Sequence, residues 1–212
     1  MPSRRCRVTT NAWPSPESSS SRSTRAGTTG RAFPAERDRL DAFLQFTARK
    51  QQKDDFTRVF VAVSDGSPEI LGYCAMNAHA VATSDLGADR PRRTPSTGGI
   101  PALYLSMIAV DRSRQGKGLG SDLAIDALGR ARSVAGEIGL KLVVLDVIDD
   151  DGSAVFAHRR GLYRRLGFRS FQDRPERIFI AIDTIRAMFG DGEPLGPVMT
   201  DRGPFLDGRP CR

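Results

Sequence analysis

Apolar residues recur at helical spacing in three segments of the chain. Residues 36–52 place leucine and phenylalanine side chains on one stripe, and residues 119–139 carry two neighbouring rows of leucine and alanine. A third, strongly basic segment over 154–166 ends at Gly167, a residue type that commonly terminates helices. Each of the three segments is therefore predicted to form a helix.

Shorter apolar runs bounded by turn residues predict strands. Between the first two runs, residues 64–69 read Ser-Asp-Gly-Ser-Pro-Glu, which predicts a tight turn and a β-hairpin. The polar residues 83–100 are expected to form a long loop. The order of helices and strands indicates an α/β protein with a mixed sheet. The expected strands cover residues 58–63, 70–76, 103–110, 141–147, 168–171 and 178–185.

The composition changes at both ends of the chain. Residues 1–32 are rich in Ser, Thr, Arg, Gly and Pro and contain few apolar residues, so this segment is expected to be disordered. Residues 189–212 are also rich in Gly and Pro and are expected to form a tail. The intervening residues 33–188 are long enough for one domain with a real core.

Cysteine and histidine usage and the hydropathy pattern disfavour several classes of protein. The 3 cysteines are scattered without a CxxC pair, and there are only 2 histidines, so neither a disulfide framework nor a metal site is expected. No apolar run approaches the ~18 residues of a membrane span. These features favour a protein of the reducing cytoplasm that needs no metal and does not enter a membrane.

A glycine-rich loop between the expected strand 103–110 and the expected helix 119–139 is the strongest candidate for chemistry. Its sequence is Gln115-Gly-Lys-Gly-Leu-Gly120. Glycines let the backbone approach an anion, and the first amides of a helix have no intrahelical acceptor, so such a loop can bind a pyrophosphate. The glycine spacing disfavours both NAD-binding and ATP-binding loops. A glycine-rich turn that merely caps the helix is the alternative.

This loop and a second motif together resemble a known family. Gln115, Gly118 and Gly120 fit the Q/R-x-x-G-x-G/A acyl-CoA loop of the GNAT N-acetyltransferases, and residues 163–168, Tyr-Arg-Arg-Leu-Gly-Phe, fit the family's Y-x-x-x-G-F signature. The two motifs follow in the family's order and are joined by a helix and a strand. The resemblance implies the GNAT fold, a single mixed and mostly antiparallel central sheet flanked by helices, and acetyl-CoA as co-substrate.

The same resemblance implies which residues bind acetyl-CoA. Backbone amides of the strand would pair with the pantetheine arm and polarise the thioester carbonyl, and the loop would hold the pyrophosphate. The strand residues are Met107, Ile108, Ala109 and Val110, and the loop residues are Gln115, Gly116, Lys117, Gly118, Leu119, Gly120 and Ser121.

The acetyl transfer also needs residues that donate and accept protons. Tyr163 is implied as the general acid that protonates the departing thiolate, since a phenol stays protonated at neutral pH; a tyrosine merely packed under the sheet is the alternative. No general base is evident. Asp146, Asp149 and Asp150 are placed to accept a proton through water, or are ordinary solvated loop residues.

Further segments are similar to one branch of the family, and the similarity covers about residues 33–185. The segments are 40–44, 60–63, 71–73, 100–101, 110–120 and 178–185. The branch comprises the acetyltransferase toxins of bacterial toxin–antitoxin pairs. This resemblance implies acetylation of the α-amine of aminoacyl-tRNA, which blocks translation, neutralisation by a ribbon-helix-helix antitoxin, and a homodimer as a plausible state.

Three departures from this branch bear on substrate identity and activity. Phe33 is followed by Pro-Ala-Glu, where the toxins usually have Asp-Cys-Gly. Met107 stands where an arginine is common, and residues 149–160 form a longer link to Tyr163 than is usual. The alternative functions are therefore a GNAT enzyme that acetylates a protein or a small-molecule amine, and a catalytically impaired relative that still binds CoA.

Positive charge is a second clue to the substrate. The formal net charge is +7, and two arginine clusters stand out. Guanidinium groups there could bind tRNA phosphates, or they could form a solvated basic face or receive the acidic tail of an antitoxin. The clusters are Arg90, Arg92 and Arg93 in the expected loop, and Arg159, Arg160, Arg164 and Arg165 around Tyr163.

Overall fold

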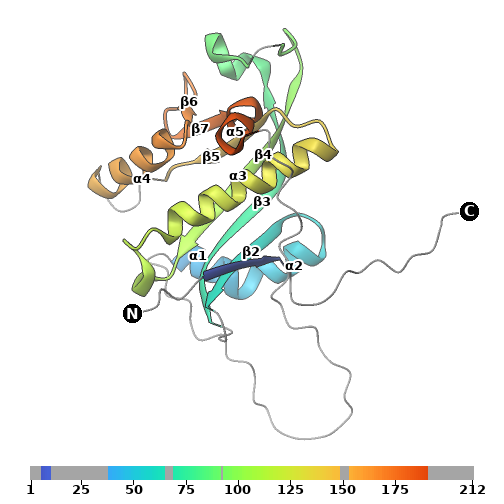
Figure 1. Cartoon of the computed structure of the whole chain (residues 1–212). Coiled ribbons are helices and arrows are strands. Elements are labelled where there is room, and N and C mark those ends of the chain that lie inside the picture. Colours follow the sequence, from blue (N-terminus) through green and yellow to red (C-terminus); the bar gives the residue numbers. More distant parts are fainter. Residues whose placement is uncertain (1–5, 11–37, 65–68, 92, 149–152, 191–212) are drawn as a thin grey trace, which may run out of the picture.

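The computed structural model describes residues 6–10, 38–64, 69–91, 93–148 and 153–190 of the 212 residues. Within these ranges, seven strands form one sheet in the order β1-β2-β3-β4-β5-β7-β6 (Figure 1). All neighbouring strands are antiparallel except β4 and β5, which are parallel. The predicted mixed, mostly antiparallel sheet is confirmed. The strands are β1 (Cys6–Thr10), β2 (Arg58–Ser64), β3 (Ile70–Ala82), β4 (Gly99–Val110), β5 (Leu142–Asp146), β6 (Arg169–Ser170) and β7 (Arg177–Ala181).

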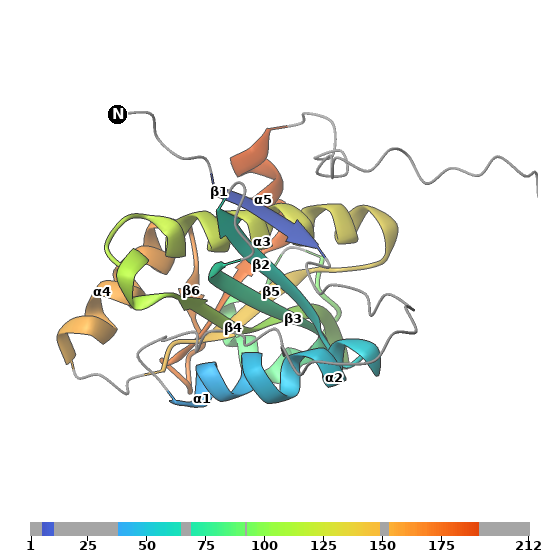
Figure 2. The same cartoon turned by 90° about the horizontal axis from the view of Figure 1, so that it is seen from below.

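Helices lie on both faces of the sheet (Figure 2). On one face, α1 (Asp38–Ala42), the π-helical turn η1 (Phe43–Thr47) and α2 (Ala48–Lys53) follow one another without a break. On the other face lie α3 (Leu119–Glu137), α4 (Ser153–Arg165) and α5 (Ile182–Phe189). The short 3-10 turns η2 (Thr83–Asp89) and η3 (Arg112–Arg114) lie in the connections. Among the described helices, none has the length and apolar character that crossing a lipid bilayer requires.

Strand residues point alternately to the two faces, so the core has two layers. Toward α3 and α5, Leu105 of β4 belongs to one cluster with Leu128 and Ile185. Toward α1 and η1, Tyr73 of β3 packs against Phe43, with their ring centroids 6.0 Å apart. The α1–α2 segment and α3 bury apolar stripes in these layers, and α4 packs partly buried apolar residues against the α3-side core, which is why the helical spacing located all three.

The structure differs from the prediction at the N-terminal end. Residues 1–32 were expected to be disordered, but Cys6–Thr10 form strand β1, which pairs antiparallel with β2. An edge strand is held by backbone hydrogen bonds and needs few apolar side chains, so composition alone did not reveal it. The remaining residues of that expectation, and the tail beyond residue 190, lie outside the described residues.

The last predicted strand, 178–185, is also corrected. The strand β7 ends at Ala181, and α5 begins at Ile182. Ile178, Phe179 and Ile180 are buried consecutively, so β7 is covered on both faces, whereas Ile182 and Ile185 of α5 are buried at a spacing of three. A strand that is buried on both faces shows no alternation of apolar and polar residues, so the apolar pattern over 178–185 did not reveal the change from strand to helix.

Gly72 lets β3, β4 and α3 approach closely. A Cβ at this position would lie 2.9 Å from the Ala109 carbonyl oxygen and 2.9 Å from Leu123 Cδ1. The variant Gly72→Ala is expected to lower the free energy of unfolding by about 1–3 kcal/mol, because backbone or core must shift. Urea unfolding measures this. Gly136→Ala, at an open position of α3, should instead stabilise by about 0.5–1 kcal/mol, and equal effects of the two substitutions would contradict the explanation.

Candidate functional site

The pairing between β4 and β5 stops part-way along β4. Only Ala102, Leu103 and Tyr104 pair with β5, although β4 continues to Val110. Within the described residues, the β4 edge that faces away from β3 therefore has no strand beside it over residues 105–110. Alternate amides and carbonyls of this stretch face the split between the two strands. A ligand lying in the split can bond to them.

A β-bulge lies at the same place. β3 pairs Ala75 with Met107 and Met76 with Leu105, which leaves Ser106 as an extra residue on β4. Ser106 Oγ donates a hydrogen bond of 3.1 Å to the Ala75 carbonyl oxygen. A bulge bends its strand and increases the local twist, which accounts for the departure of β4 from β5.

The loop between β4 and α3 is held against the end of β4. The Asp111 carboxylate accepts a 2.8 Å hydrogen bond from the Ser113 amide and so caps η3. Gln115 Nε2 donates to the Val110 carbonyl oxygen at 3.1 Å, and Lys117 Nζ donates to the Ser113 carbonyl oxygen at 2.8 Å. The two predicted side chains, Gln115 and Lys117, thus shape the loop.

The glycines give this loop a backbone that presents its amides. Gly116 and Gly118 have φ values of 70° and 90°, and a Cβ at either position would meet nothing within 4 Å. The amides of Gly118, Leu119 and Gly120 make no backbone hydrogen bond to the described residues. The Ser121 amide, by contrast, donates to the Gly118 carbonyl oxygen at 2.8 Å. Unbonded amides at the start of a 19-residue helix fit a pyrophosphate.

The predicted β4 residues offer backbone rather than side chains to such a ligand. Ala109 is buried in the layer under α1 and η1, and Met107 packs there, with its Sδ 3.7 Å from the Tyr73 hydroxyl oxygen. Ile108 and Val110 pack on the α3 side with Leu119. These side chains pack in the core, so a ligand in the split would contact the main chain of β4.

Tyr163 is placed by the way α4 ends. The Phe168 amide donates to the Tyr163 carbonyl oxygen at 3.0 Å, and the Gly167 amide donates to the Arg164 carbonyl oxygen at 3.0 Å. With Gly167 at φ 89°, these two bonds make a Schellman cap, in which the residue after the glycine packs back onto the helix. The Phe168 and Tyr163 rings meet edge-to-face, with centroids 5.6 Å apart. The Y-x-x-x-G-F motif therefore fixes the position of Tyr163 at the end of α4.

The Tyr163 hydroxyl has no hydrogen bond to any residue in the described ranges, although its ring is partly buried against the α3-side core. Loss of solvation raises the pKa of Tyr163 to about 12, and the nearby Arg159 only partly offsets this. The phenol therefore stays protonated at neutral pH and retains a proton to donate. An unbonded donor here fits a bound sulfur or oxygen atom.

A sequence comparison decides the family. The GNAT acetyltransferase domain matches residues 55–170, a span from the end of α2 to β6 that includes both motifs. The chain belongs to the GNAT acetyltransferase family. Membership confirms the predicted N-acetyltransferase class with acetyl-CoA as donor. The split in the sheet and the amide-bearing loop of this GNAT domain suit that donor.

The most similar relatives of this GNAT protein include bacterial toxins. A probable toxin TacT from Sinorhizobium fredii is 37% identical over 151 residues, covering 71% of this chain and 83% of the relative. A tRNA-acetylating toxin from Mycobacterium tuberculosis is 30% identical over 160 residues, covering 76% of this chain and 90% of the relative. Among solved structures, a Tyr-to-Phe mutant of the toxin AtaT, bound to acetyl-CoA and the C-terminus of its antitoxin AtaR, matches with a TM-score of 0.59 and 20% identity. It covers 74% of this chain and 88% of AtaT.

The predicted arginines fall into two groups that flank the turn between β6 and β7. From α4, Arg160 Nη2 donates to Ser170 Oγ of β6 at 3.2 Å. From η2, Asp85 lies 4.0 Å from Arg174 in the turn. Arg159 donates to the Ile148 carbonyl oxygen at 3.4 Å. Arg164 and Arg165 are exposed in the last turn of α4, Arg90 and Arg93 are exposed after η2, and Arg92 lies outside the described residues.

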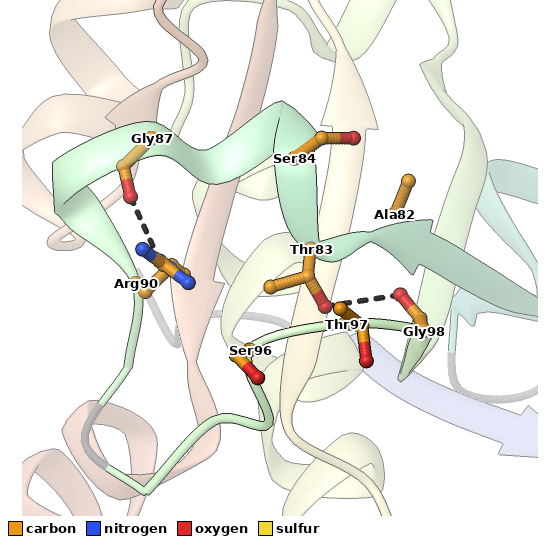
Figure 3. A pocket seen from close by; sticks show the side chains of 8 residues that line it. All are labelled: Ala82, Thr83, Ser84, Gly87, Arg90, Ser96, Thr97 and Gly98. Atoms are coloured by element: carbon orange, nitrogen blue, oxygen red, sulfur yellow. Dashed lines mark hydrogen bonds between the residues drawn. The ribbon is translucent and has the colours of Figure 1, made fainter.

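Arg90 belongs to a hollow of about 510 Å³ at the far end of the β3–β4 hairpin (Figure 3). Arg90 Nε donates to the Gly87 carbonyl oxygen at 3.0 Å, and Thr83 Oγ1 donates to the Gly98 carbonyl oxygen at 3.0 Å. Ser96 and Thr97 add hydroxyl groups to the lining. The hollow lies at the Gly99 end of β4, opposite the end that carries the glycine-rich loop.

Sequence reasoning missed a polar cluster on the sheet face opposite α3. Arg177 Nε and Nη2 donate to the two oxygens of Asp146 at 2.7 and 2.9 Å, and the Tyr104 hydroxyl donates to Asp146 Oδ2 at 2.8 Å. Mainly because of the Arg177 bonds, the pKa of Asp146 lies below its ordinary value. The His79 ring lies 5.4 Å from the Tyr104 ring, and burial lowers the pKa of His79. These residues come from four strands, so linear spacing gave no signal.

Two of the acidic residues considered for proton transfer, Asp149 and Asp150, lie outside the described residues. The third, Asp146, is the last residue of β5 and not part of a solvated loop. Its bidentate bond to Arg177 keeps it ionised but makes it a weak base.

All three tyrosines of the chain should titrate late. Burial raises the pKa of Tyr104 and of Tyr163 to about 12, and raises that of Tyr73 still further. The unfolded chain would lose these protons near pH 10, so the stability that the neutral phenols contribute is complete below about pH 10 and is lost as the pH rises toward 12. Ultraviolet absorbance of tyrosinate measures this in the folded protein and in urea. A common midpoint near 10 in both states would contradict it.

Proposed function

We propose that this enzyme transfers the acetyl group of acetyl-CoA to the α-amino group of aminoacyl-tRNA and thereby blocks translation. The observation that carries the proposal is the 30% identity to a tRNA-acetylating toxin over 160 residues, which cover 90% of that toxin. The 37% identity to a probable toxin TacT supports a role as a toxin. Because the similarity extends well beyond the acetyl-CoA loop, it includes elements that can contact the acceptor.

The residues described above have distinct parts in this reaction. Amides at Gly118, Leu119 and Gly120 would hold the pyrophosphate, and backbone amides of Met107–Val110 would polarise the thioester carbonyl. The amine nitrogen forms the new bond to the carbonyl carbon while the carbon–sulfur bond breaks. Tyr163 would give its proton to the sulfur and regain one from solvent, and the nitrogen would lose one proton to water. The α-amine of an aminoacyl ester is less basic than a lysine side chain, so no strong base is required.

The arginines that flank the β6–β7 turn support a polyanionic acceptor. Arg160 and Arg164 lie one helical turn apart on α4, and Arg165 is exposed beside them. On the η2 side of the turn, Arg90 is bonded to the Gly87 carbonyl oxygen, and the exposed Arg93 follows it three residues later in the chain. We propose that this basic surface contacts tRNA phosphates.

We further propose that a ribbon-helix-helix antitoxin neutralises the enzyme in the cytoplasm. The complex of AtaT with the C-terminus of its antitoxin AtaR supports an antitoxin as partner. An acidic antitoxin segment would compete with RNA for the same arginines. A homodimer is the expected oligomeric state.

Transfer of labelled acetyl from acetyl-CoA to a mixed pool of charged tRNA tests the function. Label is expected on charged tRNA and not on uncharged tRNA, because only the former carries an α-amine. Tyr163→Phe should lower the transfer rate by about 100-fold or more, as expected for loss of a general acid, with acetyl-CoA affinity unchanged. Absence of label on charged tRNA, with acetyl-CoA bound normally, would redirect the assignment to a protein or small-amine acceptor or to an impaired enzyme.

Neutralising the α4 arginines tests the RNA surface. A variant with Arg159, Arg160, Arg164 and Arg165 all changed to Gln should bind charged tRNA more weakly. The slope of log affinity against log salt should become shallower by about 3, because each lost phosphate contact removes about 0.7–0.9. A control with Arg132→Gln and Arg186→Gln, on α3 and α5, should leave the slope within about 1. Equal slopes for wild type and the quadruple variant would place RNA elsewhere.

A further inference from the structure

The Tyr104–Asp146–Arg177 cluster lies where β4 and β5 separate. Tyr104 is the last β4 residue that pairs with β5, Asp146 is the last residue of β5, and Arg177 lies opposite Asp146 in β7. Tyr104 packs with Val144 and Phe179, which belong to the sheet face opposite α3. The cluster therefore lies where the split between β4 and β5 begins, on the sheet face opposite α3.

The acetyl-CoA elements lie toward the other face. The loop ends at the start of α3, and Tyr163 packs in the α3-side core. A donor whose pyrophosphate rests at the start of α3 reaches the split from that side. An amine that attacks the thioester carbonyl must then approach from the opposite side, which is the side that carries Tyr104.

The hydrogen bonds of the cluster leave the Tyr104 oxygen able to accept a further hydrogen bond. Both Asp146 oxygens accept from Arg177, and Oδ2 also accepts the Tyr104 hydroxyl proton. Tyr104 has thus spent its only donor; its oxygen also interacts with Arg177 and keeps one further acceptor position. An acceptor amine needs a hydrogen-bond acceptor at the split, because its N–H groups must be bound while its lone pair remains free for attack.

We propose that Tyr104 binds the acceptor amine: its phenolic oxygen accepts one N–H and thereby turns the nitrogen lone pair toward the thioester carbonyl. Asp146 and Arg177 act through Tyr104 as positioning residues. The His79 ring, 5.4 Å from the Tyr104 ring, supports its orientation from β3. The inference rests on the proposed function only in requiring an amine as acceptor, and not on tRNA.

The charges of the cluster suit a neutral nucleophile. An unpaired carboxylate at this place would favour the ammonium form of the acceptor, which has no lone pair. Here Arg177 balances the Asp146 charge, and the Tyr104 phenol is neutral at pH 7, with its pKa raised to about 12 mainly by burial. The amine is held without being charged.

Steady-state kinetics of Tyr104→Phe test the proposal, because this change removes the accepting oxygen and keeps the ring. The kcat/KM for the acceptor is expected to fall about 10- to 100-fold, while the Kd for acetyl-CoA stays within about twofold. Asp146→Asn should give a smaller fall, since the phenol remains but loses its alignment. Unchanged kcat/KM for the acceptor in Tyr104→Phe would overturn the proposal.

A matched control separates this role from stability. Asp126 and Arg130 of α3 form a pair at 2.6 Å with side chains 22% and 18% exposed, close to the 27% and 23% of Asp146 and Arg177. Asp126→Asn should lower the melting temperature about as much as Asp146→Asn does but leave acceptor kcat/KM unchanged. Equal kinetic losses in the two variants would show that the effect is structural and overturn the proposal.

The choice of acceptor substrate distinguishes a failure of the proposed function from a failure of the Tyr104 proposal. Charged tRNA is used first, and methionine amide, spermidine and a lysine-containing peptide are used if wild type does not modify tRNA. Failure on tRNA alone overturns the proposed function, while the Tyr104→Phe comparison proceeds on the amine that wild type acetylates. Failure of wild type on every amine would overturn both.

Discussion

The separation of β4 from β5 is the constraint on which the rest of the site depends. Parallel pairing holds for only three residues, and the bulge at Ser106 then turns β4 away. The backbone of residues 105–110 is thereby left for a ligand, and the loop that follows Val110 continues the same line of main-chain donors into the start of α3. Because the proposed contacts to acetyl-CoA are main-chain contacts, side chains along β4 can vary with the needs of the core without loss of the site.

The two tyrosines near the split differ in what their hydroxyl groups can offer. The Tyr163 hydroxyl has no hydrogen-bond acceptor within the described residues, whereas the Tyr104 hydroxyl donates a hydrogen bond to Asp146. One phenol is therefore a donor and the other an acceptor, although burial raises the pKa of both. Their positions toward opposite faces of the sheet match the opposite needs of a leaving sulfur and an attacking nitrogen.

Motifs and periodicity predicted much of the fold and pointed to the residues proposed to bind acetyl-CoA. Helical spacing located α3, and the Y-x-x-x-G-F motif located Tyr163 because the cap geometry needs a glycine and an aromatic residue at fixed offsets. The Tyr104–Asp146–Arg177 cluster was beyond reach, since its members are brought together only by strand register across β4, β5 and β7. The strand β1 was missed for a related reason: its partner lies 50 or more residues away in β2, and its own five residues carry little apolar signal.

That strand has a consequence for handling the protein. Cys6–Thr10 occupy the outer edge of β2, whose residues Phe60–Ser64 would otherwise present an unpaired ladder of amides and carbonyls. The β2 side chains Phe60, Val61 and Ala62 are buried, so this edge is apolar on both faces. Trimming the chain to the segment that composition marks as globular would uncover a row of unpaired amides and carbonyls, which is a template for pairing with a second copy.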